Sequence, residues 1–276
     1  MAPSTRFRAA LVQMRSGRNV DANVAACEAL IRSAAAQGAH YVQTPEVTTL
    51  MELDRERLFE AIRPEAGNPA LARFTALARE LGIWLHIGSM GILNGERIAN
   101  RSYVISPSGE IAARYDKIHM FDVRLANGET YAESANYAPG SRAVTAALPW
   151  GKLGLTICYD LRFPALHQAL AKSGAVMLAV PAAFTRPTGE AHWHTLLRAR
   201  AIETQCFVFA AAQGGMHEHG RETYGHSLIV SPWGTILAEA GTEPGVITAD
   251  IDLAEVAAVR TRIPALSHGR TFTVEN

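Results

Sequence analysis

Short apolar runs and amphipathic stretches alternate along the chain. The run from Arg8 to Met14 predicts a strand, and the stretch after it has apolar residues every three or four positions, which is typical of a helix. The stripe on this helix consists of Val20, Val24, Cys27, Ile31 and Ala34 or Ala35. We expect Gly38 to end the helix, because glycine readily adopts the left-handed backbone of a helix cap.

The sequence repeats itself in two places. Residues 38–45, Gly-Ala-His-Tyr-Val-Gln-Thr-Pro, return in altered form as residues 174–181, Gly-Ala-Val-Met-Leu-Ala-Val-Pro, and each copy predicts a buried strand ended by proline. Residues 102–111 and 227–236 both contain two β-type runs joined by Ser-Pro-x-Gly, which is a hairpin signal. Because the two echoes keep the same order, the sequence predicts two related halves, each with the order strand, helix, strand, helix, strand and hairpin.

The second half supplies its own strands and helices. Residues 153–158 predict an apolar strand, and Pro164 opens a helix that Gly174 ends. Residues 190–205 predict a further helix with apolar residues on one side. These residues are Trp193, Leu196, Leu197 and Ile202.

The end of the chain completes the predicted fold. Asp252 and Glu255 form a capping-box pattern for a last helix that stops before Pro264. Strands that alternate with helices favour parallel pairing, with helices covering the sheet. No linker rich in proline, glycine or serine separates the halves. We therefore predict one α/β domain over residues 1–276, in which two sheets pack face to face with helices outside.

Composition narrows the classes of function. Basic and acidic residues number 26 each and no basic run stands out, which disfavours a nucleic acid or an anionic membrane surface as partner. The longest apolar run, residues 175–184, is far shorter than the ~20 residues of a membrane span. Residues 9–12 form too short an apolar stretch for the core of a signal peptide. Because Cys27, Cys158 and Cys206 form no C-x-x-C pair, we expect reduced thiols and a cytoplasmic protein.

Cys158 is the candidate nucleophile. It follows an apolar strand that leads into a helix, and such strand ends carry the sites of open α/β sheets. A thiol there would be partly exposed near backbone N–H groups, as a nucleophile requires. The alternative is a buried structural cysteine, which is the interpretation we favour for Cys27 and Cys206.

Three charged residues are candidate partners of this thiol. Glu46 follows the repeated strand, whereas the second copy has Ala182 at that position, so the fold itself does not require a carboxylate there. In a closed pocket, burial would raise the pKa of Glu46 and suit it to proton transfer. Lys117 follows the first hairpin and Glu133 lies in the Gly/Asn-rich loop beyond it. Taken singly, each has the character of an ordinary solvated surface residue.

The motifs that contain these residues resemble those of the nitrilase superfamily of carbon–nitrogen hydrolases. Thr-Pro-Glu at 44–46, Asp-Lys-Ile-His-Met-Phe-Asp at 116–122 and Gly-Leu-Thr-Ile-Cys-Tyr-Asp-Leu-Arg-Phe-Pro at 154–164 each hold one member of a Glu-Lys-Cys triad, in the order of that superfamily. Tyr-Ala-Glu-Ser at 131–134 resembles the segment with its second active-site glutamate. The resemblance covers essentially the whole chain. It implies a four-layer αββα sandwich, a homodimer or larger homo-oligomer, and no cofactor or metal.

The amidase branches of the superfamily are the most similar. Cys-Tyr-Asp at 158–160 resembles them, while the Cys-Trp-Glu typical of nitrilases is absent. Residues 191–206 and 210–215 resemble the deaminated glutathione amidases most, and the alternative is an omega-amidase acting on alpha-ketoglutaramate or succinamate. The resemblance thus implies hydrolysis of a small, carboxylate-bearing primary amide to an acid and ammonia.

The same resemblance implies a role for each site residue. Glu46 takes the thiol proton of Cys158, and the thiolate attacks the substrate carbonyl. Lys117 and the backbone N–H of Tyr159 stabilise the negative charge on the carbonyl oxygen. Glu133 orients the substrate amide and Lys117.

Further residues are candidates for contact with the substrate. Arg162 follows the nucleophile by four positions, and its planar guanidinium suits a substrate carboxylate. The alternative for Arg162 is a salt bridge, for example with Asp160. Phe184, Trp193 and the loop at 216–219 are the other expected neighbours of the pocket.

Other classes of function remain to be weighed. A metallohydrolase would have to use His192-x-His194 or His217-Glu218-His219, but neither is H-E-x-x-H, and residues two apart on a helix point different ways. A cysteine–histidine hydrolase would use His119 as its base. A serine hydrolase lacks its G-x-S-x-G elbow. A binding protein on the same fold would not need the full set of two acids, an amine and a thiol.

Overall fold

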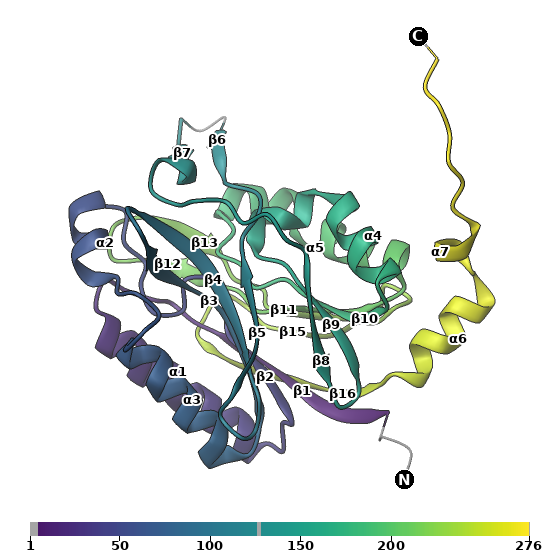
Figure 1. Ribbon diagram of the computed structural model, residues 1–276, viewed down its shortest axis with the longest axis horizontal. Coiled ribbons are helices and arrows are strands. Elements are labelled where there is room, and N and C mark those ends of the chain that lie inside the picture. The colour runs from purple at the N-terminus through teal and green to yellow at the C-terminus, as the bar shows by residue number, and fades with distance from the viewer. Residues whose placement is uncertain (1–4, 126–127, 276) are drawn as a thin grey trace.

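The computed structural model describes residues 5–125 and 128–275, and it contains two six-stranded sheets (Figure 1). In spatial order, the strands of the first sheet are β16 (Gly245–Asp252), β1 (Arg6–Gln13), β2 (Tyr41–Gln43), β3 (Trp84–Asn94), β4 (Arg97–Ile105) and β5 (Ile111–Asp116). Those of the second sheet are β15 (Ile236–Glu239), β14 (Leu228–Val230), β11 (Phe207–Ala210), β10 (Ala175–Ala179), β9 (Gly151–Leu155) and β8 (Val144–Leu148).

Helices cover the outer face of each sheet. The first sheet is covered by α1 (Val20–Ala36) and α3 (Pro69–Leu81), and the second by α4 (Pro164–Lys172) and α5 (Arg186–Thr204). The resulting layers, helix, sheet, sheet and helix, confirm the predicted αββα sandwich.

The remaining elements are short. They are the helices α2 (Arg55–Ala61), α6 (Ala254–Arg262) and α7 (Ala265–His268), the ribbon of β6 (Asp122–Arg124) and β7 (Thr130–Ala132), the ribbon of β12 (Gly214–Met216) and β13 (Glu222–Tyr224), and the 3-10 turns η1 (Glu133–Ala135) and η2 (Cys158–Arg162). None of the helices within the described residues combines the length and apolar character needed to cross a bilayer.

The internal repeat is confirmed by the topology. In the first sheet, β1, β2 and β3 run parallel and the antiparallel hairpin β4–β5 follows. In the second, β9, β10 and β11 run parallel and the hairpin β14–β15 follows. The two hairpin turns contain Gly109 and Gly234, whose φ values of 80° and 84° lie in the left-handed region.

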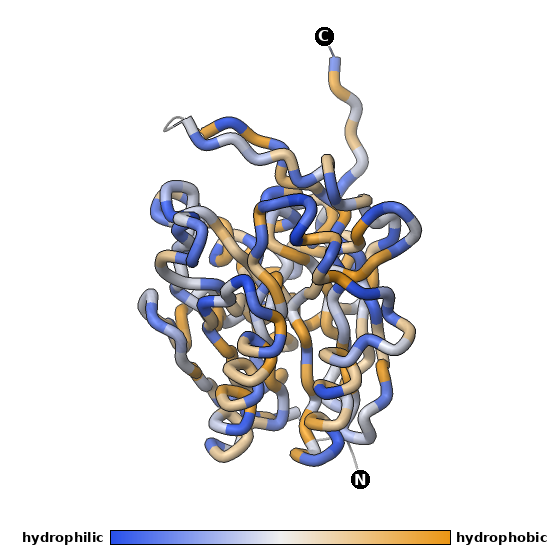
Figure 2. The backbone as a smooth tube through the Cα atoms, turned by 90° about the vertical axis from the view of Figure 1, so that its left-hand side faces the viewer, coloured by the Kyte–Doolittle hydropathy of each residue, from blue (hydrophilic) through white to orange (hydrophobic). Residues whose placement is uncertain are grey.

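The inner faces of the two sheets form the main core. One cluster of buried residues joins Leu11 and Tyr41 of the first sheet to Leu155, Met177 and Phe209 of the second. Figure 2 shows hydrophobic segments along the strands in the middle of the molecule and hydrophilic segments in loops around them. Complete burial of such a side chain contributes roughly 1.5–3 kcal/mol, so this core fixes how the two sheets, and the loops at their edge, lie relative to each other.

Two predictions about helices were wrong in detail. Helix α5 begins at Arg186 rather than at residue 190, with Pro187 in its first turn. Ile202 of this helix is 51% exposed instead of buried, while Trp193 and Leu197 face the core. Ile202 points toward Gly234 of the β14–β15 turn, where a glycine leaves room for it.

The predicted capping box is also absent. Asp252 accepts a hydrogen bond from the backbone of Ala254 and pairs with Arg6, and α6 has Leu253 at its N-cap without a side-chain cap. The carboxylate of Asp252, which the sequence pattern assigned to the cap of this helix, therefore pairs with Arg6 of β1 instead. A further short helix, α7, follows Pro264.

Candidate active site

A cavity of about 290 Å³ opens where several strand ends meet. Its lining includes Glu46, Lys117, Glu133 and Cys158, which the sequence had singled out from four separate segments. Glu46 lies just beyond β2, Lys117 follows β5 directly, and Cys158 lies just beyond β9. The sheets thus bring together side chains that are remote along the chain.

Glu46 is held by donors from three directions. Its side chain is buried, and Oε2 accepts a hydrogen bond of 2.9 Å from the backbone of Ala183. Oε1 accepts hydrogen bonds from Asn100 Nδ2 at 3.0 Å and from Lys117 Nζ at 2.9 Å. Gly88 permits this arrangement, because a Cβ atom there would lie 2.1 Å from the carbonyl oxygen of Thr44.

Lys117 lies between two carboxylates. Its ammonium is 2.9 Å from Glu46 Oε1 and 2.8 Å from Glu133 Oε2, and its side chain is only 2% exposed. Burial alone would lower the pKa of Lys117, but the charges of Glu133 and Glu46 outweigh burial and raise it well above its usual value. The two glutamates therefore favour the ammonium form of Lys117 in the cavity.

Glu133 begins the 3-10 turn η1 and reaches back toward Lys117. Its Oε2 also accepts a hydrogen bond of 2.7 Å from the backbone of Phe121, and Oε1 accepts one of 3.2 Å from Asn100. Asn100 thus donates to both glutamates. The four groups form one continuous hydrogen-bonded network.

Cys158 sits on a strained turn rather than in a strand. The apolar strand β9 ends at Leu155, and Cys158 opens η2 with a φ of 51°, in the left-handed region that costs a non-glycine residue of order 1–3 kcal/mol. The backbone N–H of Cys158 donates to the carbonyl oxygen of Pro181 at 2.9 Å, which fixes the turn against the neighbouring strand end. This conformation directs the thiol into the cavity beside Glu46.

Asp160 ties the cysteine turn to the segment that carries Lys117. Oδ2 of this fully buried carboxylate accepts hydrogen bonds from Tyr115 at 2.6 Å and from the backbone of Ile157 at 2.9 Å. Oδ1 accepts one from the backbone of His119 at 3.0 Å. Two loops from different sheets are thereby fixed at a constant separation.

The protonation states of the central pair differ from the sequence-based expectation. Burial opposes ionisation of Glu46, yet the Lys117 ammonium, hydrogen bonds from Cys158 and Lys117, and the charge of Arg221 together lower its pKa. The prediction of a raised pKa for Glu46 was wrong, because these opposing effects outweigh burial. Burial and the nearby Glu46 charge raise the pKa of the Cys158 thiol, against the opposing effect of Lys117. A lowered pKa for Glu46 and a raised pKa for Cys158 favour a thiol beside a carboxylate in the resting site.

This arrangement is suited to acyl transfer. A thiol beside a carboxylate base provides a nucleophile that is activated as it attacks, and an adjacent ammonium can stabilise negative charge on an oxygen. Tyr159 and Phe184, also singled out from the sequence, line the same cavity.

Two other predicted contacts lie elsewhere. Arg162 and Trp193 are not among the described residues that line the cavity. Arg162 packs over the ring of Phe184 at 5.4 Å and contacts His192 at 3.3 Å, and the salt bridge with Asp160 is not formed. Trp193 lies buried behind Phe184, with ring centroids 4.9 Å apart.

The loop at 216–219 does not line the cavity either. His217 bonds to the backbone oxygen of Ser16 at 2.9 Å and to Thr223 at 2.8 Å, which is a structural role. The residue that enters the cavity from this region is Arg221, just beyond the loop. Sequence reasoning missed Arg221 and Asn100: a single arginine after a histidine-rich loop gave only a weak signal, and an asparagine within a strand gave none.

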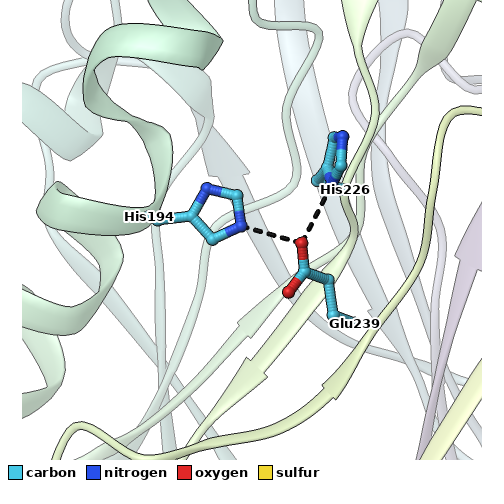
Figure 3. A group of neighbouring side chains, drawn as sticks. All are labelled: His194, His226 and Glu239. Carbon is cyan, nitrogen blue, oxygen red and sulfur yellow. Dashed lines mark hydrogen bonds and ion pairs between the residues drawn. The ribbon is translucent and has the colours of Figure 1, made fainter.

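One group of side chains within the described residues could hold a metal ion. His194 Nε2 and His226 Nδ1 each lie 2.9 Å from Glu239 Oε1 (Figure 3). These residues are not among those that line the cavity, and the shared carboxylate oxygen already serves as hydrogen-bond acceptor for both imidazoles.

Comparison with known proteins gives consistent matches. A family model described as carbon-nitrogen hydrolase matches residues 8–261. The chain is 41% identical to the deaminated glutathione amidase of Yersinia enterocolitica, over 95% of this chain and 92% of that protein. The crystal structure of the C. elegans NitFhit protein matches with a TM-score of 0.91 and 36% identity, over 98% of this chain and 66% of that one.

A second solved structure that matches this chain contains a modified cysteine. It is a mutant of the amidase from Nesterenkonia sp. AN1, with covalent addition of the acetamide moiety of fluoroacetamide at the active-site cysteine. This structure matches with a TM-score of 0.80 and 26% identity, over 98% of this chain and 95% of that one.

Proposed function

This chain belongs to the carbon–nitrogen hydrolase family and is a hydrolase acting on amides, and from this premise we propose that Cys158 attacks a small amide that carries a carboxylate. The observation that carries the proposal is the convergence of Cys158, Glu46 and Lys117 on one cavity. Deaminated glutathione is the substrate we favour, because relatives that bear the name deaminated glutathione amidase match nearly the whole chain.

The proposed reaction begins with proton transfer. Glu46, ionised in the resting site, takes the thiol proton as the sulfur of Cys158 attacks the amide carbonyl. The carbonyl oxygen becomes negative and is stabilised by the Lys117 ammonium and the backbone N–H of Tyr159. Loss of one such donor typically costs about 3 kcal/mol of transition-state stabilisation.

The second half of the reaction releases the acid. The C–N bond breaks as Glu46 returns its proton to the leaving nitrogen, so that ammonia or an amine departs and a thioester to Cys158 remains. Glu46 then takes a proton from water as the water oxygen attacks the thioester carbonyl. The C–S bond breaks, Glu46 returns the proton to the sulfur of Cys158, and the carboxylic acid leaves. Glu133 keeps Lys117 in place throughout, since it accepts hydrogen bonds from that ammonium with both oxygens.

A thiol nucleophile has support from a relative. In the Nesterenkonia amidase the acetamide moiety of fluoroacetamide is attached to the active-site cysteine. Cys158 lines the cavity, while Cys27 lies on the buried face of α1 in the core.

A shorter substrate is the second candidate. The cavity volume of about 290 Å³ lies at the lower end of the range for ligand pockets and favours a compact molecule. An omega-amidase activity on alpha-ketoglutaramate or succinamate would fit this volume.

We further propose that the chain works as one domain in a cytoplasmic homodimer or larger homo-oligomer. Three free cysteines are compatible with a reducing compartment. The C-terminal segment extends away from the body of the molecule, and Phe272 and Val274 on it are 87% and 80% exposed (Figure 1). Apolar side chains on such a segment would be buried by a second copy. Light scattering on the purified protein tests this oligomeric state.

A substrate panel tests the proposed activity. The panel contains deaminated glutathione, alpha-ketoglutaramate, succinamate, a simple nitrile and an N-carbamoyl amino acid, with the acid product and the released ammonia or amine both measured. We expect the first three to be hydrolysed and the nitrile to be inert. Turnover of the nitrile or the carbamoyl compound alone would overturn the proposal.

A further inference from the structure

Arg221 brings a positive charge into the cavity without an acidic partner. It lines the same cavity as Cys158 and Lys117. Within the described part of the chain, no carboxylate lies within ion-pair distance of its guanidinium. Its contacts are with uncharged groups: Nη2 donates to the carbonyl oxygen of Ala183 at 2.7 Å, and Nη1 lies 3.9 Å from the sulfur of Met51.

One hydrogen-bond donor of Arg221 is unused. Nε is shielded from solvent and has no partner. The guanidinium also packs over the ring of Tyr131 at 5.2 Å, which holds its plane in position. A buried N–H of a charged group without an acceptor is costly, so the described residues do not satisfy the hydrogen-bonding capacity of this guanidinium.

The other charged groups that line the described part of the cavity have ion-pair partners. Glu52 pairs with Arg18 at 2.7 Å, and Lys117 is shared by Glu46 and Glu133, which leaves one excess negative charge in that group. Arg221 makes no ion pair with any described residue, and its charge acts on Glu46 only from a distance, where it lowers the pKa of that carboxyl.

We propose that Arg221 binds the carboxylate of the substrate and so selects acidic amides over neutral ones. This inference rests on the proposed function, and it adds the residue that recognises the substrate's charged end. A planar guanidinium presents pairs of N–H donors that suit a carboxylate through two parallel hydrogen bonds.

Arg162, the sequence-based candidate for this role, provides a matched comparison. It is the same type of residue, but it lies over the ring of Phe184 and contacts His192 instead of lining the cavity. We therefore expect substitution by methionine to change the preference for acidic amides at Arg221 but not at Arg162.

The test compares Arg221→Met and Arg162→Met on two amides of similar length, succinamate and butyramide, which differ in the carboxylate. For Arg221→Met we expect kcat/KM for succinamate to fall about 100-fold relative to kcat/KM for butyramide, because a charge-paired contact to the carboxylate is lost. Arg162→Met should leave the ratio of the two unchanged. Arg221→Lys keeps the charge without the planar edge, so we expect an intermediate loss on succinamate of about 10-fold.

Binding provides a second readout that needs no turnover. Calorimetric titration of succinamate into the Cys158→Ala protein should give a measurable affinity, which the added Arg221→Met substitution removes and the added Arg162→Met substitution retains. Thermal melts verify that each variant is folded. Equal losses on both amides for Arg221→Met, or a changed ratio for Arg162→Met instead, would overturn the inference.

The outcomes separate this inference from the proposed function. If the native enzyme hydrolyses both amides but Arg221→Met leaves their ratio unchanged, only the role of Arg221 is wrong. If the native enzyme hydrolyses neither amide, binds no succinamate and does not cleave deaminated glutathione, the proposed function and the inference both fail.

Discussion

Nζ of Lys117 lies 2.9 Å from Oε1 of Glu46, and both side chains are almost completely buried. A buried ion pair of this kind is strongly coupled, because removal of one partner leaves the other as an uncompensated charge. The cavity contains a second carboxylate, Glu133, on the same ammonium. The protonation and the stability of the site therefore depend on Lys117 more than on any other side chain in it.

Substitution Lys117→Met should destabilise the protein as well as inactivate it. Two carboxylates, Glu46 and Glu133, would remain buried without a cation between them, and we expect the free energy of unfolding to fall by about 3–5 kcal/mol at neutral pH. Urea unfolding measures this loss. The loss should shrink with Glu133→Gln added to Lys117→Met, since one of the two charges is then gone; a double variant as unstable as the single one would contradict the charge argument.

Replacement of the thiol should separate activity from folding. Cys158→Ala removes the nucleophile but leaves the hydrogen bond from the backbone of residue 158 to Pro181 in place. We expect turnover to drop at least about 1,000-fold with an unchanged melting profile. Intact-mass measurement after acid quenching should detect an acyl adduct in the native enzyme and none in this variant.

Cys206→Ala is the matched control. This cysteine is buried in the core next to β11 and donates to the carbonyl oxygen of Ala175, away from the cavity. Its loss should cost some stability but leave the activity per folded molecule and the acyl adduct intact. An adduct that persists in Cys158→Ala and disappears in Cys206→Ala would reverse the assignment.

The pKa of Glu46 predicts the acid limb of the pH profile. Because this pKa is lowered in the folded protein, the carboxylate stays ionised below its ordinary value of 4.5. The stabilisation that it contributes is complete above that ordinary value and is lost as the pH falls through the lower, folded value. We expect kcat/KM to keep its plateau down to about pH 4.5, measured with short assays in which the enzyme is verified to be folded. An acid limb centred near pH 6 would contradict this, because it would mean that burial raises the pKa of Glu46 by more than the charge of Lys117 lowers it.

Asp160 should behave as a positioning residue. In Asp160→Asn, one carboxylate oxygen becomes an amide donor that faces Tyr115 or His119, both of which donate to the aspartate. We expect a stability loss of about 2–3 kcal/mol and a lower kcat, with KM nearly unchanged, since the cysteine turn shifts relative to Lys117. Tyr115→Phe removes one of these donors, so we expect it to lower both the stability and kcat, each by less than Asp160→Asn does. A change confined to stability would limit Asp160 to a structural role.

Much of the fold could be predicted from the sequence, because strands, helices and repeats leave patterns among residues that are close together along the chain. Hydrophobic spacing marked the strands and helices, and the repeat of residues 38–45 at 174–181 marked two halves that form the two sheets. The contrast between Glu46 and Ala182 in that repeat singled out a carboxylate that the fold does not need. Ile202 was placed wrongly although the evidence is local: it follows Trp193 by nine positions, which at about 100° per residue puts it on the opposite, exposed face of α5.

The tertiary structure decided which charged groups meet. Arg162 and Arg221 are the same residue type, and only the packing of loops at the sheet edge places Arg221 in the cavity and Arg162 beyond Phe184. The direction of the pKa shift of Glu46 likewise follows from the distance to Lys117, 71 positions away. Periodicity is set by neighbours along the chain and can be read from it, whereas electrostatic and packing energies depend on distances in space that no local pattern encodes.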